Sequence, residues 1–191
     1  MNRRKALKNI GAGIGAIALT PTVVSLFHSC QTEISYSSVF FTKNDFKIVS
    51  TLMELIIPKT DIPGAIELKL PEFVDSYIDA VYDEKRKGFL ASGLGEFLAV
   101  GIKDASKEKA THLSINDWDS QLVKYLKPGN KTLQEENQAA KFVSELRSLT
   151  VNAFKTNEFI GENVLAYASI PGKQEGCVDL METTGGKAWS L

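Results

Sequence analysis

Cysteine and histidine are nearly absent from this chain of 191 residues, which contains only two of each. The cysteines are Cys30 and Cys177, and the histidines are His28 and His112. So few ligands exclude a CxxCH haem attachment, a zinc site of the Cys/His type and a cysteine-ligated iron–sulfur cluster built from this chain alone. We therefore expect this chain to hold no metal and no cofactor of its own.

A basic patch is missing as well. Lysine and arginine number 22 and the acids 23, but Arg3, Arg4, Lys5 and Lys8 precede Cys30 and no acid does. From Cys30 onward, 18 basic residues therefore stand against 23 acidic ones, a net charge of −5. A mildly acidic domain without a cluster of positive charge does not attract a phosphate backbone, which excludes nucleic acid as a partner.

Alternation of apolar and polar residues, the signal of a half-buried strand, is also missing, whereas apolar residues recur at helical intervals in five segments. The predicted helices span about residues 42–57, 71–81, 84–102, 114–126 and 133–154. Thr42 and Asp45 have capping-box spacing, and Pro71 is acceptable at a first helical position. We predict a mainly α fold, a compact bundle of about five helices with an irregular C-terminal tail rich in glycine and proline.

The third predicted helix contains four glycines, at positions 88, 93, 95 and 101. Glycine weakens an isolated helix, so this segment depends on tertiary packing. We expect the close approach of a second helix to explain these glycines.

Acidic residues are frequent in the second predicted helix and at the start of the third. They include Asp75, Asp79, Asp83 and Glu84. Paired carboxylates are typical of acid–base catalysis, but these alternate with an apolar stripe, as the polar face of an amphipathic helix does. Because we also find no nucleophile with a base and no phosphate-binding glycine loop, the sequence predicts a non-catalytic protein. An enzyme acting through Asp61 or His112 is the least favoured interpretation.

The first 29 residues have the composition of an export signal. Residues 2–8 are basic, and residues 10–27 form an uncharged run diluted by glycine. Arg3 and Arg4 resemble the bacterial twin-arginine consensus, although Ala6 stands where an aromatic residue is commoner. That route carries folded proteins, often with a cofactor or a bound partner. The alternative is an ordinary signal that happens to contain two arginines, but the glycine-diluted core favours the twin-arginine route.

Cys30 is a candidate for lipidation, because residues 27–30 resemble a degenerate bacterial lipobox. Ser29 fits this motif, whereas Phe27 and His28 fit it poorly. The alternative is cleavage nearby, which would leave Cys30 as an ordinary thiol. In either case we expect the protein in the periplasm or on the periplasmic face of a membrane, held there by a lipid anchor if Cys30 is modified.

The sequence divides into four parts: a signal at 1–29, a Ser-rich tether at 30–41, a helical domain at 42–167 and a tail at 168–191. The tail is interrupted by glycine, proline and threonine, yet it contains several apolar residues. These are Ile170, Cys177, Val178, Leu180, Met181 and Trp189. Such a segment either docks on a partner or packs back on its own domain.

Four stretches resemble parts of one known family. They are the twin-arginine leader, Phe41-Thr-Lys-Asn-Asp-Phe46, Leu55-Ile-Ile-Pro58-Lys-Thr-Asp61-Ile-Pro63-Gly64-Ala65, and Tyr167-Ala-Ser-Ile-Pro171-Gly172-Lys-Gln-Glu-Gly176-Cys177. Together they resemble the gluconate 2-dehydrogenase subunit 3 family, with the third stretch the most specific. The middle of the chain is only generically similar.

The resemblance implies a non-catalytic small subunit of an exported, FAD-dependent sugar or sugar-acid dehydrogenase. In such complexes the large subunit binds FAD and performs the oxidation, and a cytochrome c subunit often takes the electrons. The small subunit carries the export signal for a partner that lacks one, and it helps that partner to mature. The alternative function is an independent helical periplasmic lipoprotein that binds a ligand or an envelope component.

Two segments, 58–65 and 171–177, are predicted to contact the large subunit, together with the apolar tail. The candidate contact residues are Pro58, Asp61, Pro63, Gly64, Pro171, Gly172, Gly176, Cys177 and Trp189. Lipidation of Cys30 would leave Cys177 without an intrachain partner. Cys177 would then be either a buried free thiol or disulfide-bonded to the large subunit.

Overall fold

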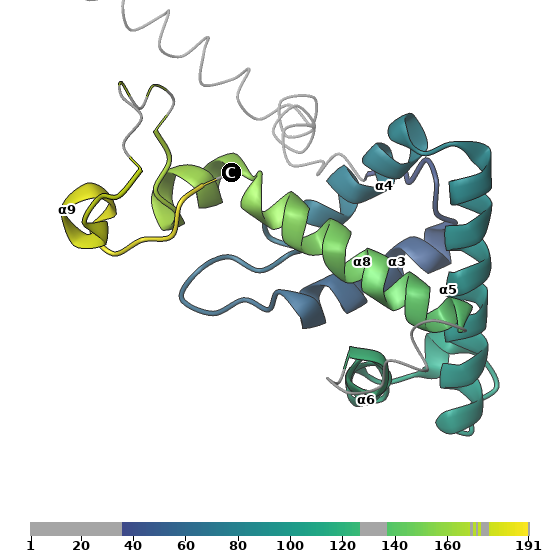
Figure 1. The fold of residues 1–191 in the computed structure, drawn as a ribbon. Helices are drawn as coiled ribbons and strands as arrows, with labels where there is room; N and C mark the ends of the chain where they lie inside the picture. Colours follow the sequence, from purple (N-terminus) through teal and green to yellow (C-terminus); the bar gives the residue numbers. More distant parts are fainter. Residues whose placement is uncertain (1–35, 127–136, 169, 171, 173–175, 191) are drawn as a thin grey trace, which may run out of the picture. The chain divides into compact units, whose positions relative to one another are not determined.

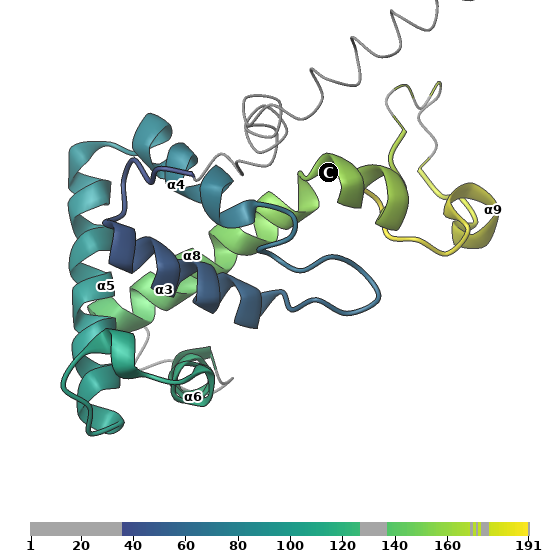
Figure 2. The same ribbon diagram turned by 180° about the vertical axis from the view of Figure 1, so that it is seen from behind.

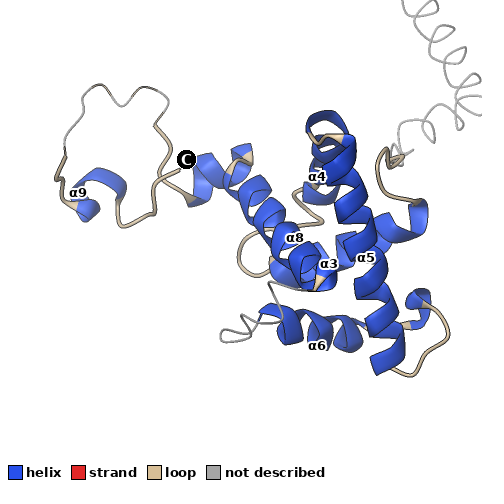
Figure 3. Ribbon diagram, turned by 45° about the vertical axis from the view of Figure 1, so that its right-hand side comes forward, coloured by secondary structure: helices blue, strands red, loops and turns tan. Residues whose placement is uncertain are grey.

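Helices make up most of the structure, a computed structural model that describes residues 36–126, 137–168, 170, 172 and 176–190. The long helices of this part are α3 (Lys43–Ile56), α4 (Leu70–Val81), α5 (Glu84–Asp104), α6 (Ile115–Leu126) and α8 (Gln138–Lys155). The short ones are η1 (Ala110–His112), η2 (Ile160–Val164) and α9 (Leu180–Thr184). Figure 3 shows helices joined by loops and no strand among the described residues. The predicted mainly α fold is confirmed.

The ends of these helices follow the predicted ones closely. The Thr42 hydroxyl accepts a hydrogen bond from the Asp45 N–H at 3.2 Å and donates one to the Asp45 carboxylate at 2.6 Å. This is the predicted cap of α3, since it satisfies an N–H group that the first helical turn leaves free. Asn137 caps α8 through the Ala139 N–H at 2.8 Å. Residues 133–136, where the fifth helix was predicted to begin, lie outside the described residues.

Helix α8 lies against all four of the other long helices, because it contacts α3, α4, α5 and α6. In Figures 1 and 2 it is the green helix that crosses the others. Its buried stripe follows helical spacing, as predicted, and includes Ala139, Phe142, Val143, Leu146 and Ala153. The hydrophobic core forms where this stripe meets buried side chains of the other four helices.

An aromatic cluster joins α5, α6 and α8 within this core. Phe97 of α5 is fully buried. Its ring centroid lies 5.9 Å from those of Trp118 and Tyr125 in α6, and 5.8 Å from that of Phe142 in α8. Aromatic pairs at these distances add stabilisation beyond the burial of their apolar area.

The glycines of α5 differ in their surroundings. A Cβ atom at Gly93 would lie 2.8 Å from the Phe142 Cβ and 2.9 Å from the Gln138 carbonyl oxygen, so α8 approaches the backbone of α5 here. At Gly101 the nearest atom would be a Leu113 methyl group at 3.2 Å. A Cβ at Gly88 or Gly95 would meet nothing within 4 Å. Close helix packing therefore explains Gly93, but the same expectation is wrong for Gly88 and Gly95.

Polar side chains at the junction of α4 and α5 bind Glu145 of α8. The Tyr82 hydroxyl donates a hydrogen bond of 2.5 Å to the Glu145 carboxylate, which also pairs with Arg86. The Arg86 guanidinium lies 3.9 Å from the centre of the Tyr82 ring. Burial of Tyr82 and its bond to Glu145 raise the pKa of the phenol well above its ordinary value of 10.

Candidate functional site

The loop between α3 and α4 is folded around one carboxylate. Glu54 of α3 accepts hydrogen bonds from the Lys59 N–H at 3.1 Å and from the Ile66 N–H at 2.8 Å. The Ala65 N–H also bonds the Ile57 carbonyl oxygen at 3.0 Å, which closes the loop at its base. Since a carboxylate accepts several hydrogen bonds, a single side chain can hold both arms of this loop.

Gly64 lies inside this loop and not on its surface. A Cβ atom there would be 2.3 Å from a Glu54 carboxylate oxygen and 2.6 Å from the Lys59 nitrogen. The residue is buried within its own chain, which gives the most specific stretch of the sequence a structural role. Of the other candidate contact residues in this loop, Pro58 and Asp61 are exposed and Pro63 is half-buried.

The C-terminal tail is held at its base by backbone hydrogen bonds. The Ala166 N–H bonds the Ala188 carbonyl oxygen at 2.7 Å, and the Ser190 N–H bonds the Ala166 carbonyl oxygen at 3.1 Å. The Lys187 ammonium adds a bond of 3.0 Å to the Asn163 carbonyl oxygen. The C-terminal end of the tail is therefore fixed to the segment that follows α8, next to the point where the tail begins.

Apolar side chains on this tail remain exposed. We name as the tail surface six side chains that are exposed by 42% or more: Tyr167, which directly precedes the tail, and Ile170, Val178, Leu180, Met181 and Trp189 within it. A cavity of about 280 Å³ adjoins the base of the tail, lined in part by Tyr167, Ser190 and Thr156. Large exposed apolar and aromatic side chains are typical of protein contact sites. Among the described residues, the tail thus combines a fixed base with uncovered apolar side chains.

The remaining candidate residues are placed as follows. Gly172 and Gly176 are exposed, and so is Cys177, which forms no disulfide among the described residues. Cys177 is therefore not buried within its own chain, and a disulfide to the large subunit stays a prediction. Pro171, Arg3, Arg4 and Cys30 lie outside the described residues.

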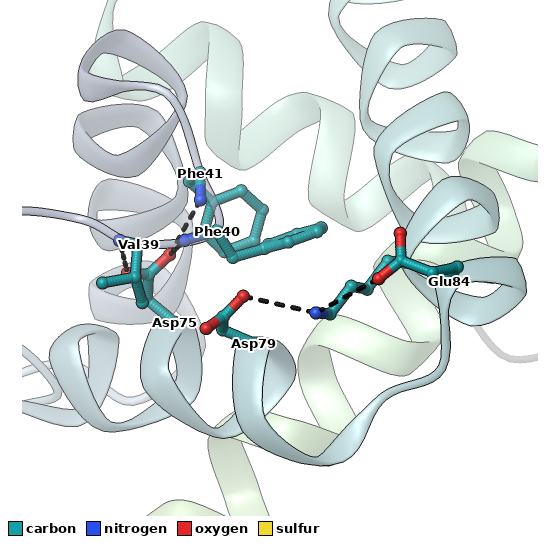
Figure 4. Close-up of polar contacts among 7 residues, drawn as sticks. Val39, Phe40, Phe41, Asp75, Asp79 and Glu84 are labelled. Carbon is teal, nitrogen blue, oxygen red and sulfur yellow. Dashed lines mark hydrogen bonds and ion pairs between the residues drawn. The ribbon is translucent and has the colours of Figure 1, made fainter.

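Asp75 departs from its predicted setting. We expected an exposed carboxylate, but Asp75 is fully buried. Its oxygens accept hydrogen bonds from the N–H groups of Val39 at 2.7 Å, Phe40 at 3.1 Å and Phe41 at 2.8 Å (Figure 4). The spacing of Pro71, Asp75 and Ile78 could have revealed this, because it places Asp75 on the buried stripe of α4.

One turn further along α4, Asp79 behaves as the sequence predicts. Its carboxylate is half exposed and pairs with the Lys87 ammonium at 3.2 Å. Lys87 also approaches the exposed Glu84 carboxylate at 3.6 Å, and dashed lines in Figure 4 mark the ion pairs of Asp79 and Glu84. Exposed ion pairs contribute little to stability, so Asp79 and Asp75 differ in role although they share a helix.

The predicted tether at 30–41 ends earlier in the structure than in the sequence division. Residues from Ser38 onward belong to the same compact unit as the helices. Phe41 is buried in the core and Phe40 packs against it. Residues 39–41 can join the folded unit because the Asp75 carboxylate accepts hydrogen bonds from their backbone N–H groups.

The two residues through which an enzyme was considered lie at the surface. His112 and Asp61 are both exposed. No group of three or more His, Cys, Asp or Glu side chains among the described residues is placed to hold a metal ion. None of the helices in the described ranges combines the length and apolar character that crossing a membrane requires.

The sequence model described as gluconate 2-dehydrogenase subunit 3 matches residues 43–172, more than half of the chain. The chain belongs to the gluconate 2-dehydrogenase subunit 3 family. The resemblance seen in the sequence is thereby confirmed, and the family's name places its members in a multi-subunit dehydrogenase. The matched range contains the five long helices and the loop around Glu54, but neither the leader nor the tail beyond Gly172.

Neither a search of curated proteins nor a search of solved structures finds a match to this chain.

Proposed function

We propose that this chain is a non-catalytic small subunit of an exported, FAD-dependent sugar or sugar-acid dehydrogenase of the gluconate type. In this role it guides the export and maturation of the flavoprotein subunit. That large subunit binds FAD and carries out the oxidation, and a cytochrome c subunit accepts the electrons. Membership of the family supports a place in such a complex.

The observation that supports a subunit role most directly is the tail surface. Its residues include the aromatic and methionine side chains that are enriched in interface cores, such as Trp189 and Met181. Because the base of the tail is already fixed at Ala166, fewer groups have to be ordered when a partner binds. A partner that covers this surface would remove its apolar area from water, which is the main driving force for association.

The export role rests on the leader. A twin-arginine signal with Arg3 and Arg4 would carry a folded complex, so one leader would serve two proteins. The complex would then work in the periplasm, where lipidation at Cys30 would tether it to the membrane.

Co-purification tests the proposal. The full chain, with an affinity tag, is expressed together with the candidate flavoprotein subunit and recovered from the periplasmic and membrane fractions, with flavin fluorescence as the readout. We expect a stable complex with the wild-type chain. Met181→Asp and Trp189→Ser should each lower the recovered flavin at least ten-fold.

The matched control is Ile115→Asp, which changes an exposed apolar residue on α6 outside the tail surface. The amount of flavin recovered with this control variant should equal that recovered with the wild-type chain. A wild-type chain that purifies as a monomer without flavoprotein would contradict the proposal, as would tail variants that bind as well as the control.

A further inference from the structure

The segment that precedes α3 is held by a long-range contact. Asp75 lies 34 to 36 residues further along the chain than the three residues whose N–H groups it binds. These three residues follow one another in a bend that precedes α3 and belongs to no helix or strand. Their hydrogen bonds therefore depend on a side chain that arrives only when α4 has packed.

The chemistry of this contact requires a carboxylate. Two oxygens with several lone pairs accept three N–H groups at 2.7 to 3.1 Å. An asparagine in the same place would turn an NH₂ group toward N–H donors. Because Asp75 and Phe41 are buried, water cannot replace the lost bonds at that end without opening the contact.

We propose that Asp75 is a fold-dependent latch, which joins residues 39–41 to the folded unit once α4 is in place. In the latched state the connection between the unit and the leader ends before Val39, Phe41 is buried, and Phe40 is partly buried against the core. In the unlatched state the connection extends to Thr42 and exposes both phenylalanines. The latch thereby protects the segment that joins the export leader to its folded domain.

That the latch protects an export leader rests on the proposed function of the leader. The contact between Asp75 and residues 39–41 does not depend on that function. The contact is therefore tested first, on the purified full chain, and its role in export is tested afterwards in cells. Hydrogen exchange of residues 39–41 and chymotrypsin cleavage after Phe40 or Phe41 report the latched state directly.

The test compares Asp75→Asn with Asp79→Asn, a matched change one turn along the same helix at an exposed ion pair. In the wild type and in Asp79→Asn, exchange at residues 39–41 should be slow and fragments that begin at residue 41 or 42 should be absent. In Asp75→Asn we expect exchange at least ten-fold faster at these residues, and we expect those fragments to appear. Val39→Pro removes one of the three donors without touching the core, and it should speed exchange at Phe40 and Phe41 if Asp75→Asn does not fold.

Wild-type exchange at 39–41 as fast as in an exposed loop would overturn the latch. Unchanged exchange in the variants would overturn it as well.

In cells, the Asp75→Asn precursor should lose its leader by cleavage at residues 40–41, and its exported amount should fall several-fold relative to Asp79→Asn. A precursor as intact as the wild type would contradict the protective role. Arg3→Lys with Arg4→Lys tests the export route separately, because unimpaired export of that double variant would refute the proposed route and leave the exchange result unaffected.

Discussion

Gly93 of α5 packs directly against Phe142 of α8, and a Cβ atom at position 93 would lie 2.8 Å from the Phe142 Cβ. The Phe142 side chain is fully buried and belongs to the aromatic cluster around Phe97. It therefore has no room to move away from a larger residue. The close packing of α5 and α8 depends on this pair.

We expect Gly93→Ala to destabilise the fold by about 1–3 kcal/mol, the usual result of overpacking a filled core. Gly95→Ala, two residues along the same helix, would meet nothing within 4 Å. It should be neutral or stabilise by up to about 1 kcal/mol, because alanine is the better helix former. Urea unfolding of both variants measures the difference, and equal stabilities would show that α8 does not press on Gly93.

The loop after α3 yields a second prediction. Gly64→Ala would force the Glu54 carboxylate away from the Lys59 and Ile66 N–H groups, because the new methyl group would occupy its place. We expect a loss of about 1–3 kcal/mol and faster proteolysis between Pro58 and Pro63. Gly176→Ala, where a Cβ meets nothing within 4 Å, is the control. An unchanged loop in Gly64→Ala would refute the structural role of this glycine.

Removal of the Tyr82 hydroxyl should weaken the junction of α4, α5 and α8. Tyr82→Phe deletes a hydrogen bond to the charged Glu145 side chain, which is partly exposed, so we expect a loss of about 1 kcal/mol near neutral pH. Tyr167→Phe, at an exposed tyrosine, should leave the free energy of unfolding unchanged.

The same pair predicts a pH dependence. The pKa of Tyr82 is raised in the folded protein above its ordinary value of 10, so its stabilising contribution is complete below pH 10 and is lost as the pH rises toward the folded pKa. The difference in unfolding free energy between the wild type and Tyr82→Phe should stay constant up to about pH 9. Above pH 10 it should shrink by at most about 1.4 kcal/mol per pH unit. Urea unfolding at pH 7, 9 and 10.5 measures it, and a constant difference across that range would contradict the burial of this phenol.

Much of the fold could be predicted because its signals are local. Apolar spacing indicated all five long helices, and the capping pair Thr42 and Asp45 placed the start of α3 correctly. The glycines of α5 mark the limit of such reasoning. Their number suggested close packing, but only the three-dimensional arrangement shows that Gly93 faces α8 and that Gly95 does not.

The interactions that define the site are long-range, and this is why the sequence could not reveal them. Gly64 was predicted to contact the large subunit, whereas the structure packs it against Glu54 of the preceding helix. The buried stripe of α4 indicates that Asp75 is buried, but not that its partners are residues 39–41, which the composition assigned to a tether. In the tail, the apolar residues were visible in the sequence, but the hydrogen bonds that fix Ala166 to Ala188 carry no sequence signal.

The central claim is that this chain takes a flavoprotein subunit out of the cytoplasm, and the most direct test is where that subunit is found when the chain is missing. The measurement is the flavin content and dehydrogenase activity of the cytoplasmic and periplasmic fractions, in cells that lack the chain and in cells that carry the wild-type chain or the Arg3→Lys, Arg4→Lys variant. We predict that the wild type alone brings the flavoprotein to the periplasm, and that it stays in the cytoplasm in the other two. Normal export of an active flavoprotein in the absence of this chain would contradict the account.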